Sequence, residues 1–328
     1  MNDQKKRFAM IGAAGFVAPR HMKAIADNGQ ELIAAFDPYD GVGVIDSWFP
    51  GASFFTEYER FDRHVEKLKR RERMVDYFSI CSPNYLHDAH VRFALRYGAH
   101  AICEKPLVLN PWNLDALEEM EKQSPGKIFN ILQLRLHPEI MALRKKVRES
   151  EPGKNYELDL TYITSRGLWY YTSWKGDTVK SGGVATNIGI HFFDMLIWVF
   201  GSVKEIEVHQ LTHDRASGWV QLERAEVRWF LSISAETLPA EIRKSGRRTY
   251  RSISIDGEEI EFSTGFEDLH SDSYKEILNG KGFGIDEARP SLELVHAIRH
   301  SVAKGPTDRA HPLAGLPLAP HPFTKRGK

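Results

Sequence analysis

The chain is poor in cysteine, in surplus charge and in long apolar runs, and each shortage excludes a class of protein. Cys81 and Cys103 are the only cysteines in 328 residues, and each ends an apolar run, which indicates buried reduced thiols and excludes a disulfide framework. Lys plus Arg and Asp plus Glu both number 44, so no net field attracts nucleic acid or a membrane surface. The longest apolar stretch, residues 188–200, is too short to span a bilayer.

Other absences indicate where the protein is located and which cofactors it lacks. The first seven residues are polar and lead into a strand-like run with no apolar signal-peptide core, which predicts a cytoplasmic protein. No cluster of His, Asp and Glu shows the spacing of metal ligands, so we expect no metal. A length of 328 residues exceeds what one hydrophobic core usually serves, and it predicts two domains.

The beginning of the chain has the order of a dinucleotide-binding unit. An apolar run, 8–11, leads into the glycine turn 12–19, which is followed by a predicted helix, a second apolar run and Asp37. In such a unit the backbone N–H groups of the turn approach a pyrophosphate, and the acid binds a ribose hydroxyl. The turn departs from G-x-G-x-x-G, because Ala14 and Val17 stand where the second and third glycines are expected. Asp37 predicts NAD rather than NADP, since a carboxylate repels a 2′-phosphate.

Apolar runs and helical patterns alternate up to residue 134, apart from a predicted polar linker at 38–50. This alternation predicts a doubly wound parallel sheet, and we assign residues 1–134 to a dinucleotide-binding domain. The carboxyl edge of the sheet should collect the polar residues that follow the strands, which are Asp37, Ser82, Pro83, Asn84, Lys105 and Arg135.

The pattern changes in the second half, residues 135–328, which we assign to a second domain. Strand-like runs follow one another there with few helices between them, which predicts a largely antiparallel sheet. The expected strands are 156–165, 203–213, 223–235, 248–256 and 258–263, and the expected helices are 190–200, 271–279 and 289–304.

Lys105 is the first candidate for chemistry, because it follows a buried apolar run in Glu104-Lys105-Pro106. A lysine that a rigid strand holds at the carboxyl edge of a parallel sheet is well placed to act on a ligand. The alternative is that Glu104 and Lys105 form a solvated ion pair before a turn.

His191 is the second candidate, behind a pair of glycines and four residues after Asn187. On a helical turn the two side chains would project from one face, as an amide beside a titratable imidazole. The alternative is a core histidine, since two phenylalanines follow it. Just upstream, segment 166–176 interleaves aromatic and basic residues, which suits either a pocket for a sugar nucleotide or a surface loop anchored by its tryptophans.

These motifs, in this order, resemble the Gfo/Idh/MocA family of sugar oxidoreductases over nearly the whole chain. The motifs are the altered glycine turn, Glu104-Lys105-Pro106, and Gly182-Gly183 followed by Asn187-x-x-x-His191-x-x-Asp194. The resemblance implies an N-terminal Rossmann domain with a parallel sheet and a C-terminal α/β domain with an open, largely antiparallel sheet. The family's D-x-x-x-H pair is changed here, because Asn187 replaces the Asp. The chain is similar in particular to one group of this family, the UDP-N-acetyl-glucosaminuronate 3-dehydrogenases of bacterial surface-polysaccharide synthesis, or WlbA/WbpB group. The similarity lies in the change to Asn187 and in the runs 11–21, 81–87 and 186–191.

The resemblance to this group implies oxidation of a UDP-sugar at C3 by NAD, for lipopolysaccharide O-antigen synthesis. It also implies that residues 135–328 bind the substrate and form the contacts of a tetramer or a dimer. Some members regenerate the cofactor with 2-oxoglutarate. The implied catalytic residues are Lys105, His191 and Asn187. The implied cofactor-binding residues are Gly12, Ala14, Gly15, Phe16, Val17, Asp37, Thr56, Ser82, Pro83, Asn84, His87, Glu104, Lys105 and Gln133. The implied substrate-binding residues are Lys105, Arg135, Tyr170, Trp174, Lys175, Asn187 and His191.

Rival functions stay open at this point. Within the family they are another sugar or inositol dehydrogenase and an NAD-dependent glycosidase that oxidises C3 transiently. Outside it the rival is a noncatalytic NAD-binding regulatory protein. A screen of sugars with and without UDP separates the enzymes, and a lack of turnover with every sugar nucleotide favours the regulator.

Overall fold

A computed structural model describes residues 5–260 and 268–324 of the chain. The chain forms two compact units, Met1–Leu136 with Glu267–Arg289, and His137–Phe266 with Pro290–Lys328. The sequence predicts contiguous domains that meet after residue 134, whereas here a late segment returns to the first unit. The predicted strand 258–263 extends beyond residue 260, so residues 261–263 lie outside the described residues.

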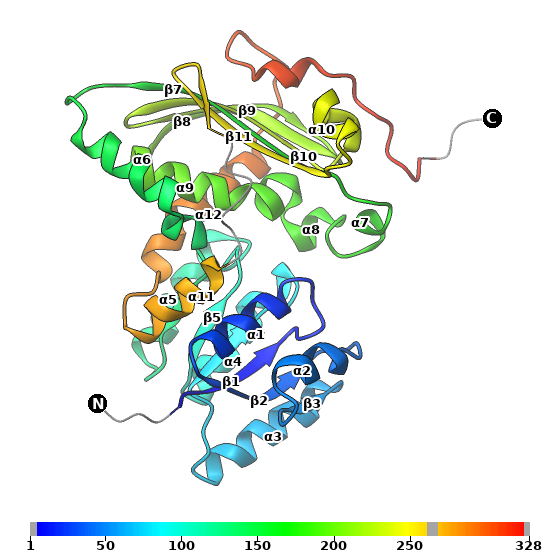
Figure 1. Cartoon of the computed structure of the whole chain (residues 1–328), viewed down its shortest axis with the longest axis vertical. Helices are drawn as coiled ribbons and strands as arrows, with labels where there is room; N and C mark the ends of the chain where they lie inside the picture. The colour runs from blue at the N-terminus through cyan, green and yellow to red at the C-terminus, as the bar shows by residue number, and fades with distance from the viewer. Residues whose placement is uncertain (1–4, 261–267, 325–328) are drawn as a thin grey trace. The chain divides into compact units, whose positions relative to one another are not determined.

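The first unit is built on a six-stranded parallel sheet of order β3-β2-β1-β4-β5-β6, which confirms the predicted doubly wound fold (Figure 1). The order reverses between β1 and β4, and in such sheets ligands bind outside the carboxyl ends of the strands at this point. The strands are β1 (Arg7–Ile11), β2 (Glu31–Phe36), β3 (Ser53–Phe55), β4 (Tyr77–Ile80), β5 (His100–Cys103) and β6 (Ile128–Asn130).

Helices cover both faces of this sheet. Residues of α1, α2 and α11 share one apolar cluster with the strands, and Phe61 of α3 and Phe93 of α4 pack with Phe78 of β4 in another. The predicted linker 38–50 contains α2, which buries a single apolar side chain, Ile45, and so lacks a clear amphipathic pattern. The helices are α1 (Ala18–Asp27), α2 (Val42–Trp48), α3 (Tyr58–Arg70), α4 (His87–Tyr97), α5 (Pro111–Lys122) and α11 (Leu269–Leu278).

The second unit has a six-stranded mixed sheet of order β12-β11-β7-β10-β9-β8, in which only the pair β7 and β10 is parallel. This confirms the largely antiparallel sheet. The sequence did not indicate β9, because its residues are small or buried on both faces and so show no alternation of polar and apolar side chains. The strand packs tightly: a Cβ on Gly218 would lie 2.6 Å from the Trp229 ring. The strands are β7 (Tyr156–Thr164), β8 (Val203–Leu211), β9 (Arg215–Leu222), β10 (Ala225–Ser232), β11 (Thr249–Ile255) and β12 (Glu258–Ile260).

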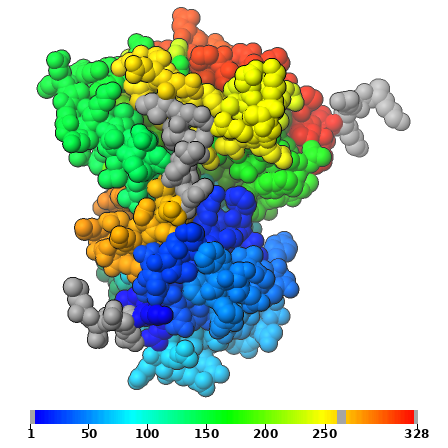
Figure 2. All heavy atoms as spheres, viewed as in Figure 1, coloured from blue at the N-terminus to red at the C-terminus, as the bar shows by residue number. Residues whose placement is uncertain are grey.

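The most apolar segment of this unit, Thr178–Phe200, contains three of its helices. By length and composition that segment passes as a membrane span, but 78% of its apolar window is buried, as in the core helix of a folded domain. In contrast, α10 has no buried residue and lies on the surface in the yellow region of Figure 2. The helices are α6 (Pro138–Glu149), α7 (Trp169–Thr172), α8 (Thr178–Ser181), the π-helix Ala185–Gly189, α9 (Ile190–Phe200) and α10 (Ala240–Lys244), and α12 (Ile285–His300) spans the boundary of the two units.

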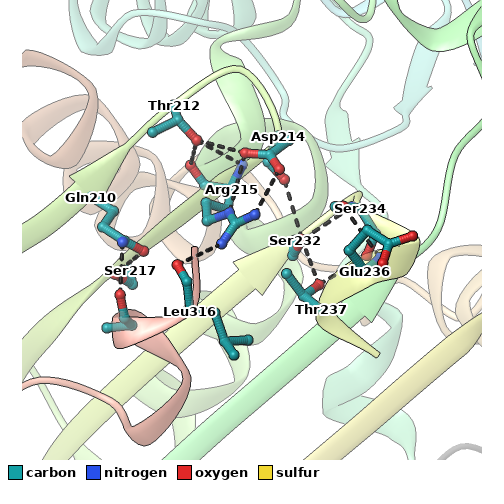
Figure 3. Close-up of polar contacts among 11 residues, drawn as sticks. Gln210, Thr212, Asp214, Arg215, Ser217, Ser232, Ser234, Glu236, Thr237 and Leu316 are labelled. Carbon is teal, nitrogen blue, oxygen red and sulfur yellow. Dashed lines mark hydrogen bonds and ion pairs between the residues drawn. The ribbon is translucent and has the colours of Figure 1, made fainter. Parts of the chain in front are cut away.

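A buried ion pair joins the sheet of the second unit to the C-terminal tail (Figure 3). Arg215, at the start of β9, is 1% exposed and donates to both carboxylate oxygens of Asp214, at 3.2 and 3.0 Å. The guanidinium also donates to the backbone oxygen of Leu316, at 3.2 Å. The tail that the sequence left without periodicity is therefore anchored to this unit by a charged group.

We expect Asp214→Ala to destabilise the protein by about 3 kcal/mol or more, because it leaves the Arg215 guanidinium buried without its counter-ion. Chemical denaturation of the second unit measures the effect. The matched control is Asp159→Ala, since the Asp159–Arg228 pair is 22% and 43% exposed at its side chains and its loss should cost about 1 kcal/mol or less. Equal losses for the two variants would contradict the assignment of Asp214 as the structural counter-ion.

Candidate active site

The glycine turn after β1 is shaped for a close approach of backbone to ligand. Gly12 has φ +90°, and a Cβ there would lie 2.5 Å from the backbone nitrogen of Ser82, so no other residue fits without moving the end of β4. The turn leads into α1, whose first residues carry no side-chain cap and include a proline. The N–H groups of Ala18 and Arg20 donate to the carbonyls of Gly15 and Val17, at 3.2 and 3.0 Å. What the helix start offers a pyrophosphate is therefore mainly the partial positive charge of the helix dipole. Ala14 and Val17 do not disturb this arrangement.

Asp37 is held at the same edge by backbone N–H groups. Its two carboxylate oxygens accept bonds from the N–H of Ala14, at 2.9 Å, and of Tyr39, at 2.9 Å. The side chain is buried and thus ordered before any ligand arrives, while each oxygen keeps a lone pair for a further donor. The position fits a carboxylate that binds the ribose hydroxyls of a dinucleotide.

Asp37→Ala should weaken NAD binding about tenfold or more, because a charge-assisted hydrogen bond is lost, and should narrow the preference for NAD over NADP. Titration of both cofactors by calorimetry measures the two affinities. Asp40→Ala is the matched control, since Asp40 is an exposed carboxylate in the same loop. Equal affinity of the unchanged protein for NAD and NADP would refute the role of Asp37.

The loops after β3 and β4 supply the next predicted cofactor residues. Thr56 follows β3 and is exposed, and Ser82 follows β4 and bonds the Nδ1 atom of His90 at 2.9 Å. Pro83 and Asn84 continue this loop into a short 3₁₀ turn. The imidazole of His87 bridges two loops, with Nε2 2.8 Å from the Ser82 carbonyl and Nδ1 2.6 Å from the Pro106 carbonyl. We propose that His87 supports the cofactor edge through these loops.

Beyond β6 the structure places Gln133 and Arg135 on a 3₁₀ turn. The Oε1 atom of Gln133 is buried and has no hydrogen-bond partner among the described residues, so it offers an acceptor at the predicted cofactor site. Arg135 is also buried, and its guanidinium donates to the backbone oxygen of Glu287 at 2.9 Å and lies over the Phe283 ring at 5.0 Å. These contacts fix its position within the first unit.

Lys105 lies just past the end of β5, where the sequence predicts it. Its side chain is half-buried, and its backbone N–H donates to Oε2 of Glu104 at 3.2 Å. Glu104 itself is buried, and the Nδ2 of Asn130 bonds the carbonyls of Cys103 and Glu104, at 2.9 and 3.3 Å. The backbone on which Lys105 stands is therefore held by side-chain hydrogen bonds.

The buried carboxylate of Glu104 accepts bonds from two histidines that the sequence did not single out. Its Oε1 lies 3.0 Å from Nε2 of His21 on α1 and 3.1 Å from Nε2 of His270 on α11. Burial opposes ionisation of Glu104, but the two imidazole donors outweigh it and hold the pKa of this carboxyl well below its usual range. In the sequence the only hint of such a role is that His21 stands beside the apolar Met22. Nothing in the sequence pairs His21 with His270, which lies 249 positions later.

In the second unit the structure brings Asn187 together with Tyr170. The Nδ2 of Asn187 donates to the Tyr170 hydroxyl at 3.0 Å, and both residues are buried. Asn187 lies in the π-helix Ala185–Gly189, and His191 follows in the first turn of α9. Two glycines with φ of +81° and +77° precede this segment, as a tight entry to the helix requires. π-Turns inside helices are frequent at functional sites.

The predicted one-face arrangement of Asn187 and His191 assumed α-helical spacing. Because the helix is widened to π geometry at Asn187, the two residues are not related by one regular α-helical turn. Nearby, the Lys175 ammonium lies 4.2 Å from the Trp174 ring and 5.9 Å from the Trp169 ring. Lys175, Trp174 and Trp169 thus form one cluster within segment 166–176.

The candidate residues are divided between the two units. Lys105 and all the predicted cofactor residues belong to the first unit, and Asn187, His191, Tyr170, Trp174 and Lys175 belong to the second. This arrangement is typical of dinucleotide-dependent oxidoreductases. It consists of a doubly wound sheet with the glycine turn at Gly12, the uncapped start of α1 and the buried Asp37, followed by a second α/β unit.

Comparison with known proteins identifies the family. Residues 6–130 match the GFO_IDH_MocA model, described as an oxidoreductase family with an NAD-binding Rossmann fold, and residues 153–298 match the C-terminal alpha/beta domain of that family. The chain belongs to the Gfo/Idh/MocA oxidoreductase family, and its first unit is an NAD-binding Rossmann domain.

Among solved structures, the chain is similar to the WlbA (WbpB) dehydrogenase from Thermus thermophilus. The two are 48% identical with a TM-score of 0.90, over 94% of this chain and 99% of that one. That dehydrogenase was crystallised with NAD and α-ketoglutarate, and also with NAD and UDP-GlcNAcA.

Curated relatives are more distant. D-glucoside 3-dehydrogenase from Escherichia coli (strain K12) is 26% identical over 41% of this chain and 39% of its own length. Inositol 2-dehydrogenase from Rhizobium meliloti (strain 1021) is 28% identical over 60% of this chain and 55% of its own length. The chain thus spans between about two fifths and just over half of the length of these curated relatives.

Proposed function

We propose that this protein oxidises the C3 hydroxyl of UDP-N-acetyl-glucosaminuronic acid to the 3-keto sugar, with NAD as the hydride acceptor. The similarity to the Thermus thermophilus dehydrogenase carries the proposal, because it extends over both units and that protein binds NAD and UDP-GlcNAcA. The glycine cradle at Gly12, the uncapped start of α1 and the unpartnered Oε1 of Gln133 suit NAD.

The reaction removes a proton from the C3 hydroxyl and a hydride from C3. We assign the base to His191, since an imidazole accepts a proton near neutral pH. Lys105 supplies a positive donor to the oxygen on which negative charge develops. Asn187, held by Tyr170, adds a neutral hydrogen-bonding group and no negative charge beside the imidazole. A bound NAD would accept the hydride from C3 and so become NADH.

The remaining substrate and cofactor assignments belong to the same proposal. Tyr170, Trp174, Lys175 and Arg135 remain assigned to the uronate and diphosphate groups. Trp174 and Lys175, both partly exposed, supply stacking and positive charge, and buried Tyr170 contributes through its hydrogen bond with Asn187. Reduction of 2-oxoglutarate to 2-hydroxyglutarate consumes NADH and a proton and so restores NAD. We further propose a cytoplasmic homo-oligomer, a dimer or a tetramer, that serves lipopolysaccharide synthesis, and light scattering of the purified protein tests its mass.

Incubation with NAD, UDP-N-acetyl-glucosaminuronate and 2-oxoglutarate tests the proposal. Mass spectrometry should show a sugar nucleotide two mass units lighter and an equal amount of 2-hydroxyglutarate. Parallel reactions with myo-inositol and with a simple glucoside distinguish the activities of the curated relatives. Turnover of either compound in place of the sugar nucleotide would overturn the proposal.

A further inference from the structure

Five side chains of the first unit form one buried hydrogen-bonded chain; four of them lie on β4, α1 and α11, and the fifth, Glu104, follows β5. The Ser79 hydroxyl on β4 lies 2.6 Å from the Tyr274 hydroxyl on α11, which lies 2.7 Å from Nδ1 of His21 on α1. His21 and His270 then both bond Oε1 of Glu104. We call these five residues the Glu104 relay. All of them are buried, so water does not replace any of these bonds at low cost.

The direction of each hydrogen bond follows from the groups present. An ionised carboxylate only accepts, so Nε2 of both histidines must donate to Glu104. Burial lowers the pKa of the His21 imidazole, although Glu104 opposes this, and burial raises the pKa of the Tyr274 hydroxyl well above its usual range. Neutral His21 therefore accepts at Nδ1 from the Tyr274 hydroxyl, which in turn accepts from Ser79. The negative charge of the relay is located on Glu104.

The same carboxylate and imidazoles have the side-chain types of a metal site, with ligand atoms within 4.8 Å of one another. Zinc takes three or four protein ligands whose lone pairs point at the ion. In the relay one carboxylate oxygen lies at hydrogen-bond distance from both nitrogens, and Tyr274 occupies Nδ1 of His21, so Nε2 carries the proton that is donated to this oxygen. The observed contacts are satisfied as hydrogen bonds without a cation.

The second oxygen of the carboxylate connects the relay to the next residue. Oε2 of Glu104 accepts from the backbone N–H of Lys105, so the charge of Glu104 and the backbone of Lys105 are fixed together. Helix α11, which returns to the first unit after the sheet of the second, contributes two of the five residues. This explains why the late segment 267–289 belongs to the first unit.

We propose that the Glu104 relay is a positioning device, in which α1 and α11 hold Glu104 ionised and immobile directly before Lys105 and so set the geometry of the lysine. The inference rests on the proposed function, because it takes Lys105 as catalytic. His21, His270 and Tyr274 are positioning residues that act through Glu104.

Tyr274→Phe and His270→Leu test the relay, each in the unchanged protein and combined with Lys105→Met. Each variant alone should lower kcat about tenfold, the rate equivalent of one buried hydrogen bond, with NAD affinity unchanged. His270→Gln should recover most of the loss, because its amide N–H can donate to Glu104. Tyr77→Phe is the matched control, since Tyr77 is another buried tyrosine of the same core and no relay bond involves it.

In the Lys105→Met protein the relay variants should change the residual turnover less than twofold, because residues that act through one group are not additive. A full tenfold effect in that background, or an equal loss in Tyr77→Phe, would show a merely structural role and overturn the inference. Normal turnover of Lys105→Met alone would instead refute the proposed function.

A spectroscopic measurement tests the relay without any substrate. Nitrogen NMR of the histidine-labelled holoprotein should show His21 as a neutral imidazole protonated at Nε2. Tyr274→Phe should leave Nε2 protonated, because Glu104 still accepts from it, and should shift the Nδ1 signal of His21, which loses its hydrogen-bond donor. An imidazolium signal for His21 at neutral pH, protonation of His21 at Nδ1 alone, or a stoichiometric metal in elemental analysis would overturn the inference.

Discussion

Replacing His191 with Asn is expected to lower kcat by roughly 10²- to 10⁴-fold, the range found when a general base is removed. Asparagine retains a hydrogen-bonding side chain at the first turn of α9 but accepts no proton near neutral pH. The fold should persist, because His191 is only partly buried and its apolar neighbours on α9 remain. Initial rates with saturating NAD and sugar nucleotide measure the loss.

The pH dependence of this variant is the sharper test. In the unchanged protein the rate should fall on the acid side, because protonated His191 cannot accept the C3 hydroxyl proton. His191→Asn should flatten that limb. His209→Asn is a useful control, since His209 is a buried histidine of the same unit that bonds Glu207 at 2.9 Å, outside the candidate site. If His191→Asn kept the acid limb of the unchanged protein, the base would be another group, and Lys105 would be examined first.

Lys105→Met should lower kcat by about 10²-fold or more and change KM much less. Methionine preserves most of the length of the side chain and removes the charge, so an interaction that strengthens as the alkoxide forms is lost from the transition state. Because the backbone at Lys105 is held by Glu104 and Asn130, the variant should keep its cofactor site, which an unchanged affinity for NAD would show.

Lys127→Met provides the control, as it removes an exposed ammonium that precedes β6 at the other end of the strands. A nearly normal kcat for Lys105→Met would show that Lys105 takes no part in the reaction. It would favour the alternative interpretation of the sequence, in which Lys105 belongs to an ion pair. The backbone contact to Glu104 would then be purely structural.

The fold follows from local patterns wherever an element is long and amphipathic or uniformly apolar. Five of the six strands of the first unit and the helix 190–200 have such patterns and are found, whereas the three-residue strand β3 was not predicted. Short or two-sided elements were missed. Helix α2 buries one apolar side chain, and β9 is covered on both faces, so neither shows the periodicity on which prediction depends.

The sequence alone determined the family, the dinucleotide turn with Asp37, and the identity of the two candidate acid–base groups, Lys105 and His191. These are properties of short contiguous motifs, whose residue types and spacing are visible along the chain. Tertiary structure decided the π geometry at Asn187 and the burial of Glu104 between His21 and His270. The two contacts of Glu104 join residues 83 and 166 positions apart, and their energy comes from exclusion of water by packing, which no local pattern encodes.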